Sequence, residues 1–313
     1  MMPLRSMLYV PGNNVRMITR AAILPMDAVI LDLEDAVPLA EKETARTLVR
    51  DFVRILSKRG IGAYVRVNSM ATGLTEEDVN TTTSKELDGV LLAKTETPDD
   101  VARLDGMLND AEQASGCEPR TIEVIALLES ARGVVNSLQI ASASNRMRAL
   151  AFGAGDYCRD FGRDVLQISK EQTELLYPRS QIANTSRAAG IQAIDTPFLG
   201  LLTDKESFSK DVVHARQLGF TGKQCIHPSH IEAINDVFSP TREDVDRARR
   251  VVDAFEEARR RGLGATSLDG RMIDNMSWQQ AKSLLNTAKA LEERKSAMKR
   301  DTNVSLSEVF GQG

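Results

Sequence analysis

The sequence predicts an α/β fold in which eight parallel strands close into a (β/α)8 TIM barrel, followed by a C-terminal helical lid extension. The length of 313 residues suits one large barrel, and amphipathic helical segments separate most of eight short apolar segments. The strand-like segments are 7–10, 28–33, 64–67, 89–93, 122–128, 149–152, 193–195 and 224–226. An open doubly wound sheet is the alternative, but no G-x-G-x-x-G pattern follows the first strand.

The connecting segments carry their own signals. Segment 38–58 has apolar residues at helical spacing and ends before Gly60, and segments 99–114 and 178–189 follow the same pattern. We therefore divide the chain into a barrel over 1–238, C-terminal helices and lid over 239–299, and a flexible tail over 300–313. Within the lid we expect a helix ending at Gly262, a loop over 264–274, and a helix over 277–299.

Composition argues against several classes of protein. The net charge of −4 lacks the basic bias of nucleic-acid binders, and no apolar run approaches the roughly 20 residues of a membrane span. The first five residues lack a signal-peptide pattern, and the cysteines, Cys117, Cys158 and Cys225, form no disulfide framework. We expect a cytoplasmic protein with reduced thiols that binds neither nucleic acid nor membranes.

The second strand segment runs directly into three carboxylates. In the stretch 28–36, Asp32 and Glu34 fall on one face because side chains alternate along a strand, and Asp35 falls in the turn that follows. Carboxylates at the exit of a buried strand cost free energy unless a cation or hydrogen-bond donors satisfy them. This pattern predicts the edge of an active site.

Other chemically active side chains also follow strands. In a barrel, catalytic residues come from the carboxyl ends of the strands, where this sequence has five acids, an arginine, a lysine and a histidine. Carboxylates with few imidazoles suit a hard cation such as Mg²⁺, which takes one or two protein carboxylates. Glu129 and Asp156, which end neighbouring strands, are the predicted pair of ligands.

At these residues the chain resembles the citrate lyase β-subunit-like lyases of the aldolase/citrate lyase superfamily, which include malyl-CoA and citramalyl-CoA lyases. The matching blocks appear in family order and cover about residues 4 to 290. They are 5–12 (RSMLYVPG), 31–37 (LDLEDAV), 65–68 (VRVN), 128–133 (LESARG), 152–157 (FGAGDY), 222–228 (GKQCIHP) and 270–274 (GRMID).

The resemblance implies a Mg²⁺ ion held by Glu129 and Asp156, with Glu34 and Asp35 supporting metal-bound water. It implies that Arg66 lies beside the bound keto acid. It also implies that Asp274 is an acid/base carried by a lid that closes over a neighbouring subunit's site in relatives. The expected assembly is therefore a homo-oligomer, a trimer or hexamer.

The reaction implied is retro-Claisen cleavage of a 3-hydroxyacyl-CoA thioester into a keto acid and acetyl-CoA. Arg16, with Arg20 as a weaker candidate, is predicted to contact phosphates of CoA, and Gly155 to contact the substrate. Two other functions stay open: a citrate lyase subunit that acts on an acyl carrier protein, and a malyl-CoA thioesterase.

Structural roles compete with these assignments. Arg66 could be an ion-pair partner, the acids after residue 33 could begin a helix, and Asp274 could be a loop acid near a helix start. Lys94 and Lys223 could suggest a Schiff-base aldolase, but ion pairing is the simpler interpretation. For His227 and His230 we favour packing at the barrel mouth over metal binding.

Overall fold

The predicted barrel is confirmed by the strand pairing. The computed structural model describes residues 3–169 and 171–301. Its eight barrel strands are parallel and pair in sequence order, and β8 pairs with β1, which closes the sheet and excludes the open doubly wound alternative. The strands are β1 Ser6–Pro11, β2 Ala28–Asp32, β3 Gly62–Val67, β4 Gly89–Leu92, β5 Glu123–Leu128, β6 Met147–Phe152, β7 Gln192–Asp195 and β8 Gly222–Cys225.

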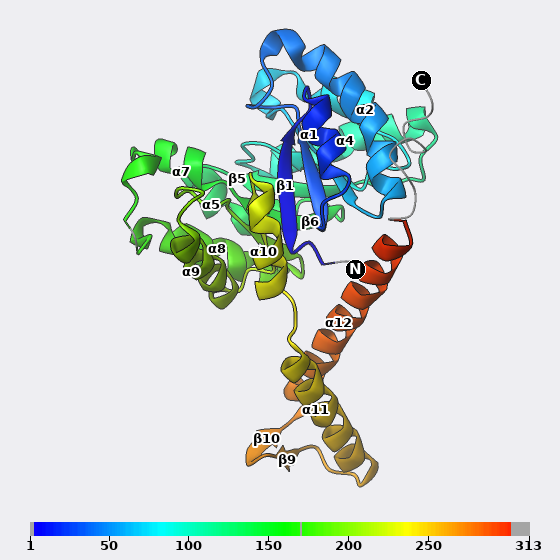
Figure 1. The fold of residues 1–313 in the computed structure, drawn as a ribbon, viewed down its shortest axis with the longest axis vertical. Helices are drawn as coiled ribbons and strands as arrows, with labels where there is room; N and C mark the ends of the chain where they lie inside the picture. The colour runs from blue at the N-terminus through cyan, green and yellow to red at the C-terminus, as the bar shows by residue number, and fades with distance from the viewer. Residues whose placement is uncertain (1–2, 170, 302–313) are drawn as a thin grey trace. The chain divides into compact units, whose positions relative to one another are not determined.

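Helices surround this sheet (Figure 1). They are α1 Val15–Ala21, α2 Lys42–Lys58, α3 Thr75–Thr82, α4 Pro98–Ser115, α5 Ala131–Val135, α6 Ser137–Ala141, α7 Ala154–Asp160, α8 Thr173–Ala189, α9 Lys205–Leu218 and α10 Ile231–Val237. Short 3₁₀ turns lie at Leu39–Glu41, Met70–Thr72, Val165–Gln167 and Pro228–His230. Helix α4 begins with a capping box between Thr97 and Asp100 and has Pro98 in its first turn.

The barrel interior is filled by apolar side chains from successive strands, which is why the strands read as apolar runs. Its buried members are Leu4, Met7, Ala28, Ile30, Tyr64, Leu91, Ile125, Leu127, Ala149, Ala151 and Ile194. The register aligns Asp32 with Pro11 on one side and with Arg66 on the other. The residues that end β1 and β2 are therefore level with Arg66 of β3.

Two expectations about local structure are wrong. Helix α8 begins at Thr173 rather than at Pro178, which lies inside the helix, because a proline in a helical pattern is not always its first residue. The expected loop 264–274 contains an antiparallel hairpin of β9 Thr266–Leu268 and β10 Arg271–Ile273. Asp269 and Gly270 form its turn with φ of 52° and 74°, and Asp-Gly is a strong hairpin signal that the sequence analysis passed over.

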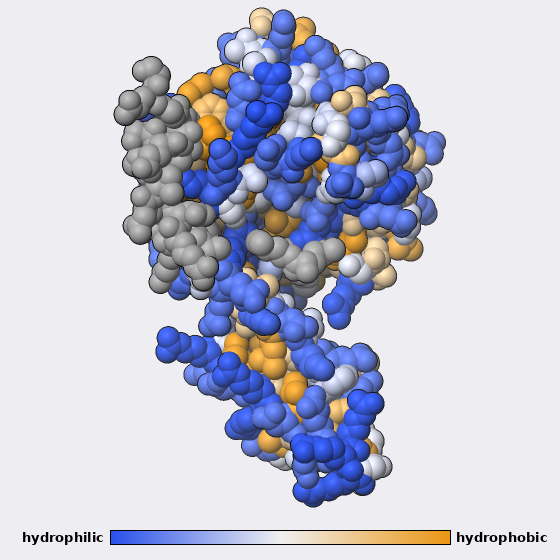
Figure 2. Space-filling model, turned by 90° about the vertical axis from the view of Figure 1, so that its right-hand side faces the viewer, coloured by the Kyte–Doolittle hydropathy of each residue, from blue (hydrophilic) through white to orange (hydrophobic). Residues whose placement is uncertain are grey.

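The chain forms two compact units, one of which is Leu4–Asp236. In the second unit, α11 Arg242–Arg260, the hairpin and α12 Asn275–Asp301 share a small core of Ala248, Val251, Phe255, Ile273 and Ala281. Figure 2 shows hydrophobic side chains on the visible surface of this unit, and Leu263, Met272 and Met276 are among its exposed residues. The helix expected over 277–299 lies within α12, and most of the predicted tail, 302–313, is outside the described residues.

Among the described residues, no helix combines the length and hydropathy that a membrane crossing requires.

Candidate active site

The turn after β2 is organised by the Asp32 carboxylate. Asp32 accepts hydrogen bonds from the backbone N–H groups of Glu34 at 2.9 Å and Ala36 at 3.1 Å. It also accepts two from Arg66, from Nε and Nη2, each at 2.6 Å. This bidentate pair joins the ends of β2 and β3, so the first of the three acids has a structural partner.

Arg66 lies in the barrel mouth with little of its side chain exposed. Its Nη1 is 3.1 Å from Oε2 of Glu34, and its guanidinium carbon is 5.0 Å from the centre of the Tyr9 ring. Burial opposes the charge, but the bonds to Asp32 outweigh it and raise the pKa of Arg66. Arg66 is therefore a fixed cation and an ion-pair partner at once; both roles proposed from the sequence are compatible with this geometry.

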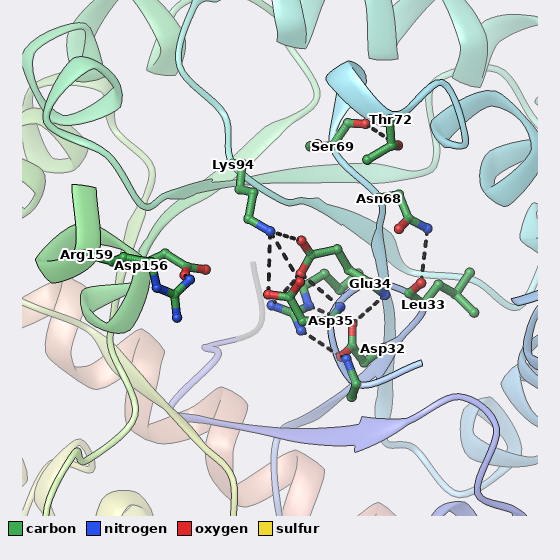
Figure 3. Close-up of polar contacts among 12 residues, drawn as sticks. Asp32, Leu33, Glu34, Asp35, Asn68, Ser69, Thr72, Lys94, Asp156 and Arg159 are labelled. Atoms are coloured by element: carbon green, nitrogen blue, oxygen red, sulfur yellow. Dashed lines mark hydrogen bonds and ion pairs between the residues drawn. The ribbon is translucent and has the colours of Figure 1, made fainter. Parts of the chain in front are cut away.

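Glu34 and Asp35 share a second cation. The Lys94 ammonium bonds Oε1 of Glu34 and lies 3.3 Å from Oδ1 of Asp35, and Figure 3 shows Lys94 reaching from the end of β4 toward both. Burial raises the pKa of Glu34, which is 5% exposed, although Arg66 and Lys94 oppose that shift. Neither acid begins a helix: both lie in a turn that precedes the 3₁₀ turn at Leu39–Glu41.

Buried polar side chains donate hydrogen bonds to the backbone carbonyls of this turn. The Lys42 ammonium donates to the backbone carbonyls of Leu33 at 2.6 Å and Glu34 at 3.0 Å. Asn68 Nδ2 donates to the same Leu33 carbonyl, at 3.0 Å, as Figure 3 shows. The carbonyls after β2 are therefore satisfied, and the acidic turn has one defined shape.

Glu129 and Asp156, the predicted metal ligands, lie together. Glu129 is 4% exposed, and neither of its carboxylate oxygens accepts a hydrogen bond from any described residue. Burial raises its pKa well above the usual range, and the adjacent Asp156 carboxyl, close enough to share a proton, raises it further. A Cβ on Gly153 would lie 2.5 Å from Cγ of Glu129, so glycine is required for this packing.

Two adjacent carboxylates, of which the buried Glu129 has no donor, fit a cation. Asp156 lies in the first turn of α7 and also pairs with Arg159 (Figure 3). No group of three histidine, cysteine or acidic side chains is arranged to hold a metal within 3–169 and 171–301. A site with two protein ligands matches Mg²⁺, which keeps its other positions for water and substrate.

Other predicted site residues are placed individually. Gly155 is the second residue of α7, and a Cβ there would meet nothing within 4 Å. Arg16 is exposed on α1. Asp274 belongs to the second unit, where Oδ1 accepts hydrogen bonds at 2.9 Å from both the backbone N–H and the hydroxyl of Ser277, in the first turn of α12. These bonds lower the pKa of Asp274, with the backbone N–H contributing most.

The contacts of the lysines argue against a Schiff-base aldolase, and those of His230 argue against metal binding. Bonds to Glu34 raise the pKa of Lys94 to about 12 against the effect of burial, whereas a Schiff-base lysine needs a lowered pKa. Lys223 is fully buried and bonds Asp195 at 2.5 Å. His230 stacks on Phe208 with ring centres 3.9 Å apart, as its packing role predicts.

Tyr9 and Gln224 also belong to the barrel mouth, although no sequence pattern singles them out as site residues. The Tyr9 hydroxyl donates to Oε1 of Gln224 at 2.7 Å, and Nε2 of Gln224 donates to the carbonyls of Phe152 at 2.8 Å and Asp195 at 3.0 Å. These contacts link β1 and β8 to the ends of β6 and β7. Both residues occur in motif blocks, but only the register shows that they meet.

Comparison with known proteins identifies the family. The family model described as HpcH/HpaI aldolase/citrate lyase matches residues 5–228. The chain belongs to this family. It is therefore an enzyme of a lyase family, and the resemblance seen in its motif blocks is confirmed.

Relatives with assigned names match nearly the whole chain. The β subunit of citrate lyase from Haemophilus influenzae is 39% identical over 91% of this chain and 97% of its own length. A (3S)-malyl-CoA thioesterase from Cereibacter sphaeroides is 31% identical over 92% of this chain and 96% of its own. The mitochondrial citramalyl-CoA lyase of Rattus norvegicus is 28% identical over 93% of this chain and 88% of its own.

Solved structures of relatives contain magnesium, so the predicted cofactor is confirmed for the family. CitE from Mycobacterium tuberculosis, in complex with magnesium, acetoacetate and coenzyme A, is 28% identical. It matches with a TM-score of 0.69 over 92% of this chain and 98% of its own. The citrate lyase β subunit of that organism, complexed with oxaloacetate and magnesium, matches with a TM-score of 0.61 at 28% identity, over 76% of this chain and 98% of its own.

Proposed function

We propose that this chain is a Mg²⁺-dependent carbon–carbon lyase. It cleaves a 3-hydroxyacyl-CoA thioester of the citramalyl-CoA or malyl-CoA type into a keto acid and acetyl-CoA. The observation that carries the proposal is the buried Glu129 carboxylate, which has no hydrogen-bond donor and lies beside Asp156 near the Arg66 cation. Such an arrangement costs stability and is explained by a cation that binds there.

Glu129 and Asp156 would hold Mg²⁺, and Glu34 and Asp35 would accept hydrogen bonds from its water ligands. When bound, the ion supplies Lewis-acid polarisation of a substrate oxygen. Arg66 supplies a positive charge that the surrounding acids fix in place, which stabilises the oxyanion that the substrate hydroxyl forms before it becomes the keto oxygen. Its orientation needs no change during the reaction, because Asp32 already holds two of its nitrogens.

Asp274 is the proposed acid/base. Its lowered pKa keeps it ionised near neutral pH, so it is ready to accept a proton from the acyl group in the condensation direction. In the cleavage direction Asp274 must first take up a proton, which balances the proton that the substrate hydroxyl releases, and it then gives that proton to the enolate carbon. Because Asp274 also caps α12, we expect its substitution to affect the lid hairpin and helix as well as the chemistry.

The CoA portion would contact the exposed Arg16 guanidinium through its phosphates. Gly155 leaves open space at the start of α7, so the acyl group can approach the backbone there. The exposed Leu263, Met272 and Met276 of the second unit support a homo-oligomer in which the lid is shared between subunits. The trimer or hexamer and the cytoplasmic location stay predictions.

A second candidate function is that of a citrate lyase β subunit acting on citryl-acyl carrier protein, favoured by the 39% identity to that subunit. A third, thioester hydrolysis on the same site, is favoured by the 31% identity to the malyl-CoA thioesterase.

Product analysis separates these functions. The purified chain is incubated with Mg²⁺ and citramalyl-CoA, malyl-CoA or citryl-acyl carrier protein, and keto acid, acetyl thioester and free CoA are measured. Equal amounts of keto acid and acetyl-CoA support the proposed lyase. Free CoA with an intact hydroxy acid indicates the thioesterase, and turnover of only the carrier-protein ester indicates the citrate lyase subunit.

A further inference from the structure

Charges alternate through five side chains at the barrel mouth. Asp32 holds Nε and Nη2 of Arg66, Nη1 of Arg66 contacts Oε2 of Glu34, and Oε1 of Glu34 bonds Lys94, which also contacts Asp35. The two oxygens of Glu34 therefore face different cations, and Figure 3 shows the one from Lys94. Arg66 is 12% exposed in its side chain and Lys94 is 40% exposed, so the chain of charges runs from the interior toward solvent.

The backbone at Lys94 is unusual. Its φ of 51° lies in the left-handed region, which costs free energy for any residue with a Cβ and which glycine adopts without that cost. Strained backbone concentrates at functional sites, so this position directs attention to the contacts of the Lys94 side chain.

The contacts of Thr95, the next residue, explain the left-handed backbone at Lys94. Immediately after Lys94, the backbone N–H of Thr95 donates to the Leu127 carbonyl at 3.1 Å. A Cβ on Gly133 of α5 would lie only 2.5 Å from the Thr95 carbonyl oxygen. The left-handed turn thus packs the end of β4 against the segment that follows Glu129, and it directs Lys94 across the mouth.

We propose that Lys94 is a positioning residue: it holds Glu34 as a carboxylate, so that Glu34 fixes the free edge of Arg66 toward the substrate. Glu34 is 5% exposed, and a carboxylate that buried stays charged only beside cations. Without Lys94, Glu34 either takes up a proton or turns toward water, and in both cases Arg66 loses its second anchor. This role rests on the proposed lyase function, since it acts through Arg66.

The test compares crystal structures and kinetics of Lys94→Met with the wild-type protein. In the variant we expect the Arg66 Nη1 to Glu34 Oε2 distance, 3.1 Å here, to exceed about 4 Å. We expect kcat for carbon–carbon bond cleavage to fall about tenfold or more with a smaller change in KM, because misplacing a catalytic charge by 1 Å is costly. Lys94→Arg keeps the charge and should restore most of kcat.

Two controls separate positioning from general stability. Lys210→Met removes an exposed ion pair with Glu206 on α9, at 2.6 Å, and should leave kcat unchanged. Lys94→Gly and Lys94→Ala both remove the ammonium, and the glycine variant should unfold at the higher urea concentration because it relieves the left-handed backbone.

The outcomes are distinct. An unchanged Arg66–Glu34 contact in Lys94→Met, or full activity of that variant, overturns the positioning role. A wild-type protein that cleaves neither CoA ester overturns the proposed function instead. The crystal structures then still decide whether Lys94 holds Glu34 against Arg66.

Discussion

Replacing Glu129 by glutamine should make the metal-free protein more stable while abolishing its activity. Glu129 is buried without a hydrogen-bond donor, and another carboxyl, that of Asp156, lies beside it. A glutamine amide cannot carry a charge and can donate to Asp156. Relief of an unsatisfied buried polar group corresponds to about 1–3 kcal/mol, so Glu129→Gln should raise the free energy of unfolding in EDTA by about that amount.

Glu112 is the matched control because it is equally buried and fully paired. It is 1% exposed and accepts hydrogen bonds from Arg146 Nη1 at 2.7 Å and Nη2 at 2.6 Å, and from the backbone N–H groups of Arg120 and Ile122. Burial opposes its charge, but the bonds from Arg146 outweigh it and lower the pKa of Glu112. Glu112→Gln should therefore lower the free energy of unfolding, by about 2–4 kcal/mol.

The assay is urea unfolding of both variants and the wild-type protein in EDTA, with Mg²⁺-dependent activity measured in parallel. Opposite shifts of the unfolding midpoint are the predicted result. If Glu129→Gln destabilises the metal-free protein as Glu112→Gln does, then Glu129 has a stabilising partner and the reasoning that links it to a cation fails.

Three further changes test other parts of the structure. Asp211 contacts the buried Lys223 at 2.8 Å, and although burial alone would raise its pKa, that charge and others lower it. The stabilisation of the folded protein by the Asp211 carboxylate is present above the unfolded-state pKa of about 3.9 and is lost as pH falls through the lower folded-state pKa. Asp211→Asn should therefore destabilise the protein strongly at pH 7 and flatten the acid side of its profile of stability against pH. A variant as stable as wild type contradicts this. Gly153→Ala should weaken Mg²⁺ binding measured by calorimetry, because its Cβ would displace Glu129; unchanged affinity would refute the packing argument. Arg66→Lys should lower kcat/KM about a hundredfold, since a point charge cannot keep the bidentate geometry, and retention of activity would remove Arg66 from the reaction.

Much of the fold could be predicted because its signals are local. Eight apolar segments bounded by turns define the strands, and the stripe of α2, with Ala45, Val49 and Leu56 buried, is visible in the sequence. The errors are also local. Pro178 lies inside a helix although the pattern predicts a helix start there, and Asp269-Gly270 forms a hairpin turn within a segment predicted to be a loop.

The site could be predicted only in part. The sequence predicts that Glu129, Asp156 and Arg66 lie at one edge of the barrel, because they follow or end parallel strands and the carboxyl ends of parallel strands lie at the same edge. The sequence could not show that Asp32 holds Arg66, or that Lys94 is shared by two acids, because these contacts depend on register and side-chain direction. The left-handed backbone of Lys94 also has no signal in the sequence, because that conformation is expected of a glycine and not of a lysine.

Metal dependence is the most direct test of the account. Cleavage of citramalyl-CoA and malyl-CoA is measured for the purified chain with Mg²⁺ and with excess EDTA, together with Glu129→Gln. The account predicts keto acid and acetyl-CoA in equal amounts from the wild-type protein with Mg²⁺, and none in EDTA or from the variant. Cleavage that persists in EDTA would contradict the assignment of Glu129 and Asp156 as metal ligands.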